Sequence, residues 1–274
     1  MSVFMIGCAF CAGVIGALVG AFEECMLAGF LALVVCMFPG NKLMANCLSY
    51  GFIPFVAFTG AVAGTAYASK IRKHDLGGAE ILKSLNTFND ISALIISGLF
   101  AIVGVVLTYL IGLLQQPIDA GALNVIVVSV IVRIIFGDGK FWNSKIHDIP
   151  RYTTKKFEWF YIAFVGAVIG FAAAWLGKAT GNVWLPFYLS LASLLFYFIE
   201  PNFPPTHHIT CIAAYALMAT NNTIVGAVWG AIAAIVMTLI GDAINTDVST
   251  HIDPPATAIG ILSVVIWIIY YIIL

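Results

Sequence analysis

Long runs of apolar residues constrain the fold of this chain more than any other feature. Most of its 274 residues lie in such runs, many close to the length of about 20 residues that an α-helix needs to cross a bilayer. The hydrophobic set makes up 62% of the chain and charged residues 9%, whereas soluble domains average about 45–50% and about 25%. A water-soluble fold cannot bury that much apolar surface. The sequence therefore predicts an all-α, polytopic integral membrane protein.

The apolar runs predict about 10–11 transmembrane or half-membrane helices. Two runs, Cys25–Phe38 and Ile209–Thr220, are short for a span. Leu43–Ser69 is broken by Gly51 and Pro54, so it forms either a tight helical hairpin, which we favour, or one span. The clear candidates are Val3–Ala21, Ile91–Leu114, Ala120–Phe136, Trp159–Leu176, Val183–Phe198, Asn222–Ile240 and Pro254–Leu274.

Positive charge gathers in residues 70–83 and 140–156, which hold nine of the twelve Lys and Arg residues. Positively charged loops remain in the cytoplasm, so we expect loops 70–88 and 138–158 to be cytoplasmic, in a prokaryotic inner or plasma membrane. The loops with Glu23, Glu24 and Asp119 carry no Lys or Arg and fit the outside. We expect Arg133 to extend to the cytoplasmic interface and Gly77–Leu85 to form an interfacial helix.

The first and second halves of the sequence resemble each other. Phe10–Gly16 matches Phe164–Gly170, and each half closes on an Asp that precedes an apolar helix; the other matching pairs are Gly60 and Gly64 with Gly226 and Gly230, and Asp90 with Asp253. We therefore expect a first membrane repeat with an extra span (1–137), a cytoplasmic linker (138–158) and a second repeat (159–274). Repeats of this kind place a substrate path at their interface, lined by broken helices.

Polar residues at predicted helix starts are the candidate substrate-binding residues. Free N–H groups at a helix start attract anions, and histidines add donors that titrate near neutral pH. Helix caps and water-facing loops are the structural alternatives, with Asp253 a strong N-cap. The candidates are Thr206, His207, His208 and Thr210; His251, Asp253 and Thr257; and, in the first half, Asn86, Asn89 and Asp90 with Asn46 and Tyr50.

Other functional classes have little support in the sequence. The net charge of −1 offers no basic field for nucleic acid. No carboxylate pair with acid/base spacing and no glycine-rich phosphate loop is present, so we expect a protein that is not an enzyme and needs no cofactor. The six cysteines lie in apolar runs, and the Cys8-x-x-Cys11 pair has no second pair, so we expect buried thiols and no metal.

The second half resembles the HPP family of small membrane proteins. Leu195–Pro205 is similar to that family's proline segment, and Thr250–Ala258, read as THIDPPATA, is similar to its closing His-Pro-Pro motif. Here Asp253 stands where the family has His, and an Ala-Gly step is missing. The resemblance implies a transporter, and because the family includes proteins implicated in nitrite transport, it implies a small anion.

The first half is faintly similar to urea transporters, which are also duplicated. Gly60–Thr65 resembles their glycine-rich span, and Phe88-Asn89 resembles their Phe-Asn helix start. We therefore expect a transporter or channel for a small polar solute or anion. The alternatives are a urea-type neutral-solute channel, a non-transporting subunit of a larger membrane complex, and a membrane-embedded enzyme. Its expected partners are the lipid bilayer, the solute, and a homo-oligomer or membrane complex.

Overall fold

The computed structural model describes residues 1–38, 40, 54–142, 156–200 and 202–273, and over these ranges the chain is helical with no strand. This confirms the all-α prediction. Short 3₁₀ segments are η1 (Leu85–Phe88) and η2 (Ser193–Phe198), and η3 (Ile268–Ile273) is a π-helical turn. The α-helices are α1 (Val3–Val19), α2 (Ala21–Met37), α4 (Pro54–Lys70), α5 (Ile91–Gly112), α6 (Ala120–Phe136), α7 (Lys156–Thr180), α8 (Leu185–Ala192), α9 (His207–Thr220), α10 (Thr223–Ile244) and α11 (Pro254–Trp267).

Four helices in the described part of the chain are long and apolar enough to cross a membrane: α5, α7, α10 and α11 continued by η3. The α1–α2 pair makes a fifth if it is counted as one span, although the two helices are bent by 119°. The bend falls at Gly20, whose φ of 120° suits glycine. Helix α2 therefore begins at Ala21, so Glu23 and Glu24 lie in its first turn rather than in the predicted loop.

The outward surfaces of the long helices are apolar. Exposed side chains on α7 follow helical spacing and therefore share one face: Phe160, Phe164, Val168, Phe171 and Trp175. A second exposed row on α5 consists of Ile91, Ile95, Leu99 and Val103. Water-soluble monomers do not expose apolar rows of this extent. The surface is compatible with contact to lipid.

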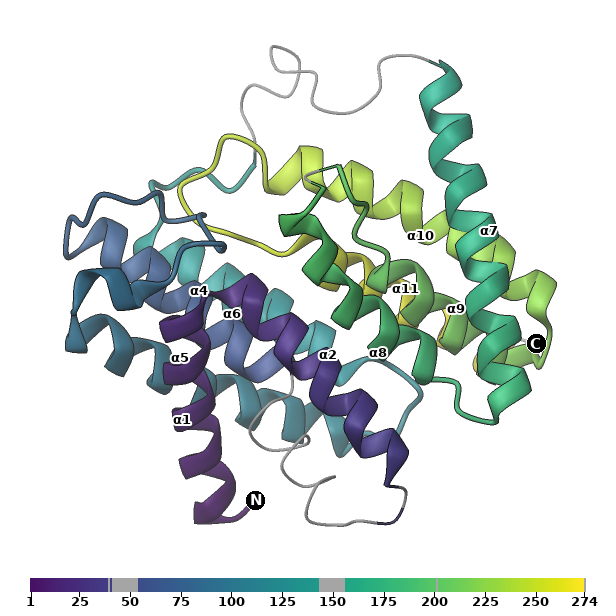
Figure 1. Ribbon diagram of the computed structural model, residues 1–274, viewed down its shortest axis with the longest axis horizontal. Helices are drawn as coiled ribbons and strands as arrows, with labels where there is room; N and C mark the ends of the chain where they lie inside the picture. The colour runs from purple at the N-terminus through teal and green to yellow at the C-terminus, as the bar shows by residue number, and fades with distance from the viewer. Residues whose placement is uncertain (39, 41–53, 143–155, 201, 274) are drawn as a thin grey trace.

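The first half of the chain occupies one side of the molecule and the second half the other (Figure 1). Helices α1, α4 and α5 pack together in the first half, as α7, α9 and α10 do in the second. The halves are joined where α2 packs against α8 and η2 and where α6 packs against α11. At the first pair Gly29 is so close to α8 that a Cβ there would lie 2.5 Å from the backbone nitrogen of Ala192.

Glycines allow the helices within each half to approach closely, as the sequence predicts. A Cβ on Gly60 of α4 would lie 2.9 Å from Gly13 Cα of α1. A Cβ on Gly230 of α10 would lie 2.7 Å from Gly170 Cα of α7. Neither site has room for a larger residue without movement of a backbone.

Arg133 does not extend to an interface, contrary to the prediction, and is only 3% exposed. Its Nε donates to Thr250 Oγ1 (3.1 Å) and its Nη2 to the Thr250 carbonyl (2.5 Å). Its Nη1 donates to the carbonyls of Ile244 (2.5 Å) and Phe141 (2.9 Å). Thr250 lies in the segment between α10 and α11 and Ile244 is the last residue of α10, whereas Phe141 follows α6 in the first half. Arg133 thus connects the first half to the second.

Of the other loop predictions, one is wrong, one is confirmed and one lies partly outside the described residues. Gly77–Leu85 is a series of turns instead of an interfacial helix, since the Gly77 N–H donates to Glu80 Oε1 (2.6 Å) and two adjacent glycines disfavour helix. Asn221 and Asn222 form the predicted turn, with Asn221 in the left-handed region and Asn222 as the N-cap of α10. The predicted hairpin of Leu43–Ser69 lies partly outside the described residues, which show one helix, α4, in its second part.

Candidate functional site

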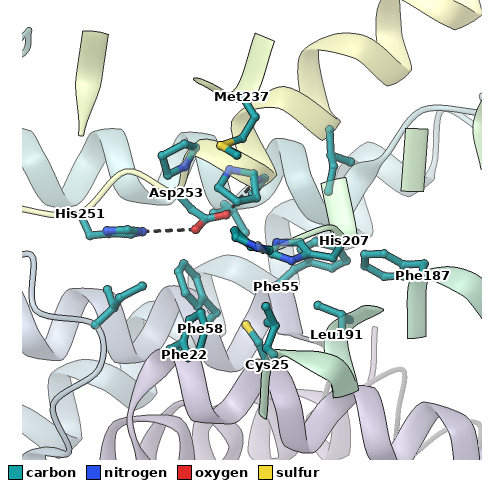
Figure 2. Close-up of a pocket in the computed structure, with 18 residues that line it drawn as sticks. Phe22, Cys25, Phe55, Phe58, Phe187, Leu191, His207, Met237, His251 and Asp253 are labelled. Carbon is teal, nitrogen blue, oxygen red and sulfur yellow. Dashed lines mark hydrogen bonds and ion pairs between the residues drawn. The ribbon is translucent and has the colours of Figure 1, made fainter. Parts of the chain in front are cut away.

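A cavity of about 230 Å³ lies between the two halves (Figure 2). The first half contributes residues of α2, α4, α6 and the loop before η1, and the second half residues of α8, η2, α9, α10 and α11. Its walls are mostly apolar. Its polar side chains are His207, His251 and Asp253, and its aromatic side chains are Phe22, Phe55, Phe58 and Phe187. Three of the predicted site residues therefore meet at one cavity.

Asp253 begins α11 as its N-cap, as predicted. Its Oδ2 accepts the Ala256 N–H (2.7 Å), and its carbonyl accepts the Thr257 N–H (3.0 Å) and hydroxyl (2.7 Å). Pro254 and Pro255 occupy the first two helical positions and have no N–H to donate. The carboxylate, 17% exposed, therefore receives a single backbone hydrogen bond at this helix start in the described structure.

His251 is held in a defined orientation by Asn245, a residue that the sequence did not single out. Asn245 Oδ1 accepts the Ile252 N–H (3.1 Å), so its Nδ2 is the atom that faces His251 Nδ1 (3.2 Å). An amide nitrogen only donates, so Nδ1 accepts and the ring proton resides on Nε2. Nε2 then donates to Asp253 Oδ1 at 3.3 Å.

His207 is the first residue of α9, and its buried Nδ1 has no hydrogen-bond partner among the described residues. His208 beside it is 1% exposed and its ring nitrogens likewise have no partner there, but it does not line the cavity. Thr206 is the N-cap of α9 but makes no side-chain cap bond. The hydroxyls of Thr210 and Ser190 share a hydrogen bond (2.8 Å), and neither residue lines the cavity.

The first-half candidates that the structure describes do not join this cavity. Asn89 and Asp90 line a separate, open pocket beside Arg72 and His74, and Asn86 lies in η1. Thr257 lines a third, apolar pocket, while Asn46 and Tyr50 lie outside the described residues. The predicted symmetric polar site, with both Asp helix starts at one cavity, is therefore not what the described residues form.

Asp90 instead makes its contacts beside the open pocket, where its own side chain is only 6% exposed. It caps α5 and accepts hydrogen bonds from the Ser92 hydroxyl (2.5 Å), Arg72 Nε (2.6 Å) and His74 Nε2 (2.8 Å). These bonds, the Ser92 bond foremost, outweigh burial and lower the pKa of Asp90 below its usual value. In the sequence, Arg72 indicated only which side of the membrane the loop faces, and His74 was not singled out.

A second buried carboxylate was missed. Asp119, expected in an outer loop, is the N-cap of α6 and is 8% exposed. Its Oδ2 accepts from the Tyr215 hydroxyl (3.2 Å) and the Cys211 thiol (3.7 Å), both on α9. Among the described residues, no group of three or more His, Cys, Asp and Glu side chains is placed to hold a metal ion.

Comparison with known proteins gives one match, to a family. None of the curated proteins and none of the solved structures matches the chain. A family model matches twice, over residues 1–141 and again over residues 142–274. The chain therefore belongs to this family, which is described as a family of unknown function (DUF7973).

Proposed function

We propose that this protein is a membrane transporter or channel for a small, compact polar solute, which passes through the cavity between the two halves. One observation carries the proposal: a chain with apolar outer helices contains, at the contact of its halves, a cavity bearing His207, His251 and Asp253. Ionisable side chains inside a membrane protein are costly and mark solute or proton pathways. A volume of about 230 Å³ holds roughly eight water molecules, so the solute is small.

The proposal places the chain in a prokaryotic inner or plasma membrane with loops 70–88 and 138–158 in the cytoplasm. Two contacts support a common side for these loops. Asp138 N–H donates to Ser249 Oγ (3.0 Å), and a Cβ on Gly78 would lie 2.3 Å from the Ser249 carbonyl oxygen. Both positively charged loops thus meet the same segment before α11, at one end of the molecule.

The proposal also treats the halves as two copies of one unit. The family model matches each half once, which supports this. The close glycine contact between α1 and α4 also has a counterpart between α7 and α10. In this scheme α2 corresponds to α8, and these two helices pack against each other, as equivalent elements do near a two-fold axis. A site at the contact between copies is the usual arrangement in duplicated transporters.

Flux into proteoliposomes tests the function. Purified protein should carry at least one solute from a panel of nitrite, formate, urea and methylammonium faster than protein-free liposomes do. Asp253→Asn should reduce that flux at least tenfold, because Asn still caps α11 but removes the charge in the cavity. Asp75→Asn, at an exposed loop position, is the matched control and should retain the wild-type rate.

Two results would contradict the proposal. One is folded, reconstituted protein that carries no solute in the panel. The other is equal loss of flux in Asp253→Asn and Asp75→Asn, which would separate transport from the cavity.

A further inference from the structure

The described lining of the cavity carries one carboxylate, on Asp253, and two imidazoles, on His207 and His251. Among the described residues that line it, Asp253 is the only acidic side chain, and none is Lys or Arg. His251 lies 3.3 Å from the Asp253 carboxylate, and because its Nδ1 accepts a hydrogen bond from Asn245 its ring is neutral and does not cancel the charge. Such a carboxylate attracts cations and repels anions, and the effect is strong where water is scarce. The sign of this charge argues against the anion that the family resemblance implied.

The start of α11 is also unsuited to an anion. Its first two positions are prolines without N–H groups, and the next two N–H groups are already bound to Asp253. The start of α9 does face the cavity through His207, but a helix end carries only about half an elementary charge. The carboxylate of Asp253 carries a full one.

The carboxylate has unused acceptor capacity. Each of its oxygens has two lone pairs. The described contacts use one bond on Oδ2, from Ala256, and one long bond on Oδ1, from His251. An ammonium group entering the cavity would therefore find acceptor positions on both oxygens without displacing either partner.

Aromatic rings line the rest of the space. Figure 2 shows Phe22 and Phe58 on the side of Asp253 opposite Met237, with Phe55 and Phe187 nearer to His207. The faces of such rings attract cations, and cages of aromatic side chains are a known way of binding alkylammonium groups. The same walls are too apolar to replace the hydration shell of a metal cation, which requires several oxygen ligands.

We propose that the cavity binds a small alkylammonium ion, with Asp253 as its counter-charge and the phenylalanine rings around its alkyl groups. This inference rests on the proposed function, because the alkylammonium ion is taken to be the solute that the protein transports. The cavity volume of about 230 Å³ limits the ion to a few carbon atoms.

Cys25 provides a direct test, because its side chain lines the same cavity. In a protein with the other five cysteines replaced, the thiol is labelled at pH 8 with two methanethiosulfonates of similar size. One carries an ethylammonium group and the other an ethylsulfonate group. Relative to a free small thiol, the cationic reagent should be favoured at least tenfold, and ethylammonium, but not acetate, should protect Cys25 from both reagents.

Substitutions make the result specific. Asp253→Asn should return the ratio of the two rates to near that of the free thiol. Phe58→Leu, which keeps an apolar side chain but removes a ring, should weaken protection by ethylammonium several-fold. Equal or faster reaction of the anionic reagent would overturn the proposal, as would a ratio unchanged in Asp253→Asn.

Labelling and flux separate the two proposals. A strong cation preference at Cys25 without flux of any solute would uphold the cation site and contradict transport. Flux of nitrite or urea without a cation preference would uphold transport and overturn the alkylammonium assignment.

Discussion

The buried guanidinium of Arg133 makes a quantitative prediction about stability. Thr250 is fully buried and its hydroxyl accepts from Arg133 Nε (3.1 Å). Thr250→Val replaces that hydroxyl with a methyl group of similar size, so no cavity forms, but a charged donor is left without its partner. Hydrogen bonds to charged groups contribute about 1.5–3 kcal/mol, and we expect the free energy of unfolding to fall by this amount.

Thr250→Ser is the matched control. It keeps the acceptor and removes one methyl group, which costs about 0.8 kcal/mol of burial. The Val variant should therefore be less stable than the Ser variant by about 1–2 kcal/mol. Reversible unfolding in mixed micelles of increasing SDS content measures the three free energies. A Val variant as stable as the Ser variant would refute the role assigned to this hydrogen bond.

Three further outcomes are expected when the free energy of unfolding is measured in the same way, with increasing SDS content. Gly230→Ala should destabilise the protein by about 1–3 kcal/mol, because the new Cβ would lie 2.5 Å from a carbonyl oxygen of α7. Gly7→Ala is the control and should not destabilise, because a Cβ there has no atom within 4 Å. Equal effects of the two substitutions would contradict the close packing of α10 with α7. Tyr215→Phe should lower the free energy of unfolding by about 1.5–3 kcal/mol, because it removes a hydrogen-bond donor to buried Asp119. An unchanged free energy of unfolding would mean that this carboxylate is hydrated instead of buried. Asp90 has a lowered pKa, so its stabilisation is present above the unfolded value of about 3.9 and is lost as the pH falls toward the folded value. The loss of stability in Asp90→Asn at pH 7 should therefore shrink below about pH 4, and a loss that does not change with pH would contradict the ion pair with Arg72.

The helical architecture could be predicted because it depends on local pattern. Ala120–Phe136 has the bounds that the apolar run predicts, and α11 begins at the predicted Pro254. Asp90 and Asp253 cap their helices because a short carboxylate before an apolar run reaches the free N–H groups of the first turn. These features require only neighbouring residues.

The features that could not be predicted depend on distant contacts. Arg133 is buried only because carbonyls from residues 244 and 250 reach it, more than a hundred positions along the chain. The cavity walls include Phe22 and Phe58, two of twenty phenylalanines, and nothing local distinguishes them from those that face outward. His207, His251 and Asp253 were identifiable because histidines and acids are rare in this sequence.

The contact between the halves determines whether either half is stable without the other. Neither half closes the cavity alone, since α2 needs α8 and α6 needs α11 to cover its inner face. Each half produced alone should therefore be unstable and prone to aggregation. Produced together as two separate polypeptides divided at residue 141, where the first family match ends, they should reassemble without a peptide bond between them, because side-chain packing and the Arg133 contacts are sufficient to join them.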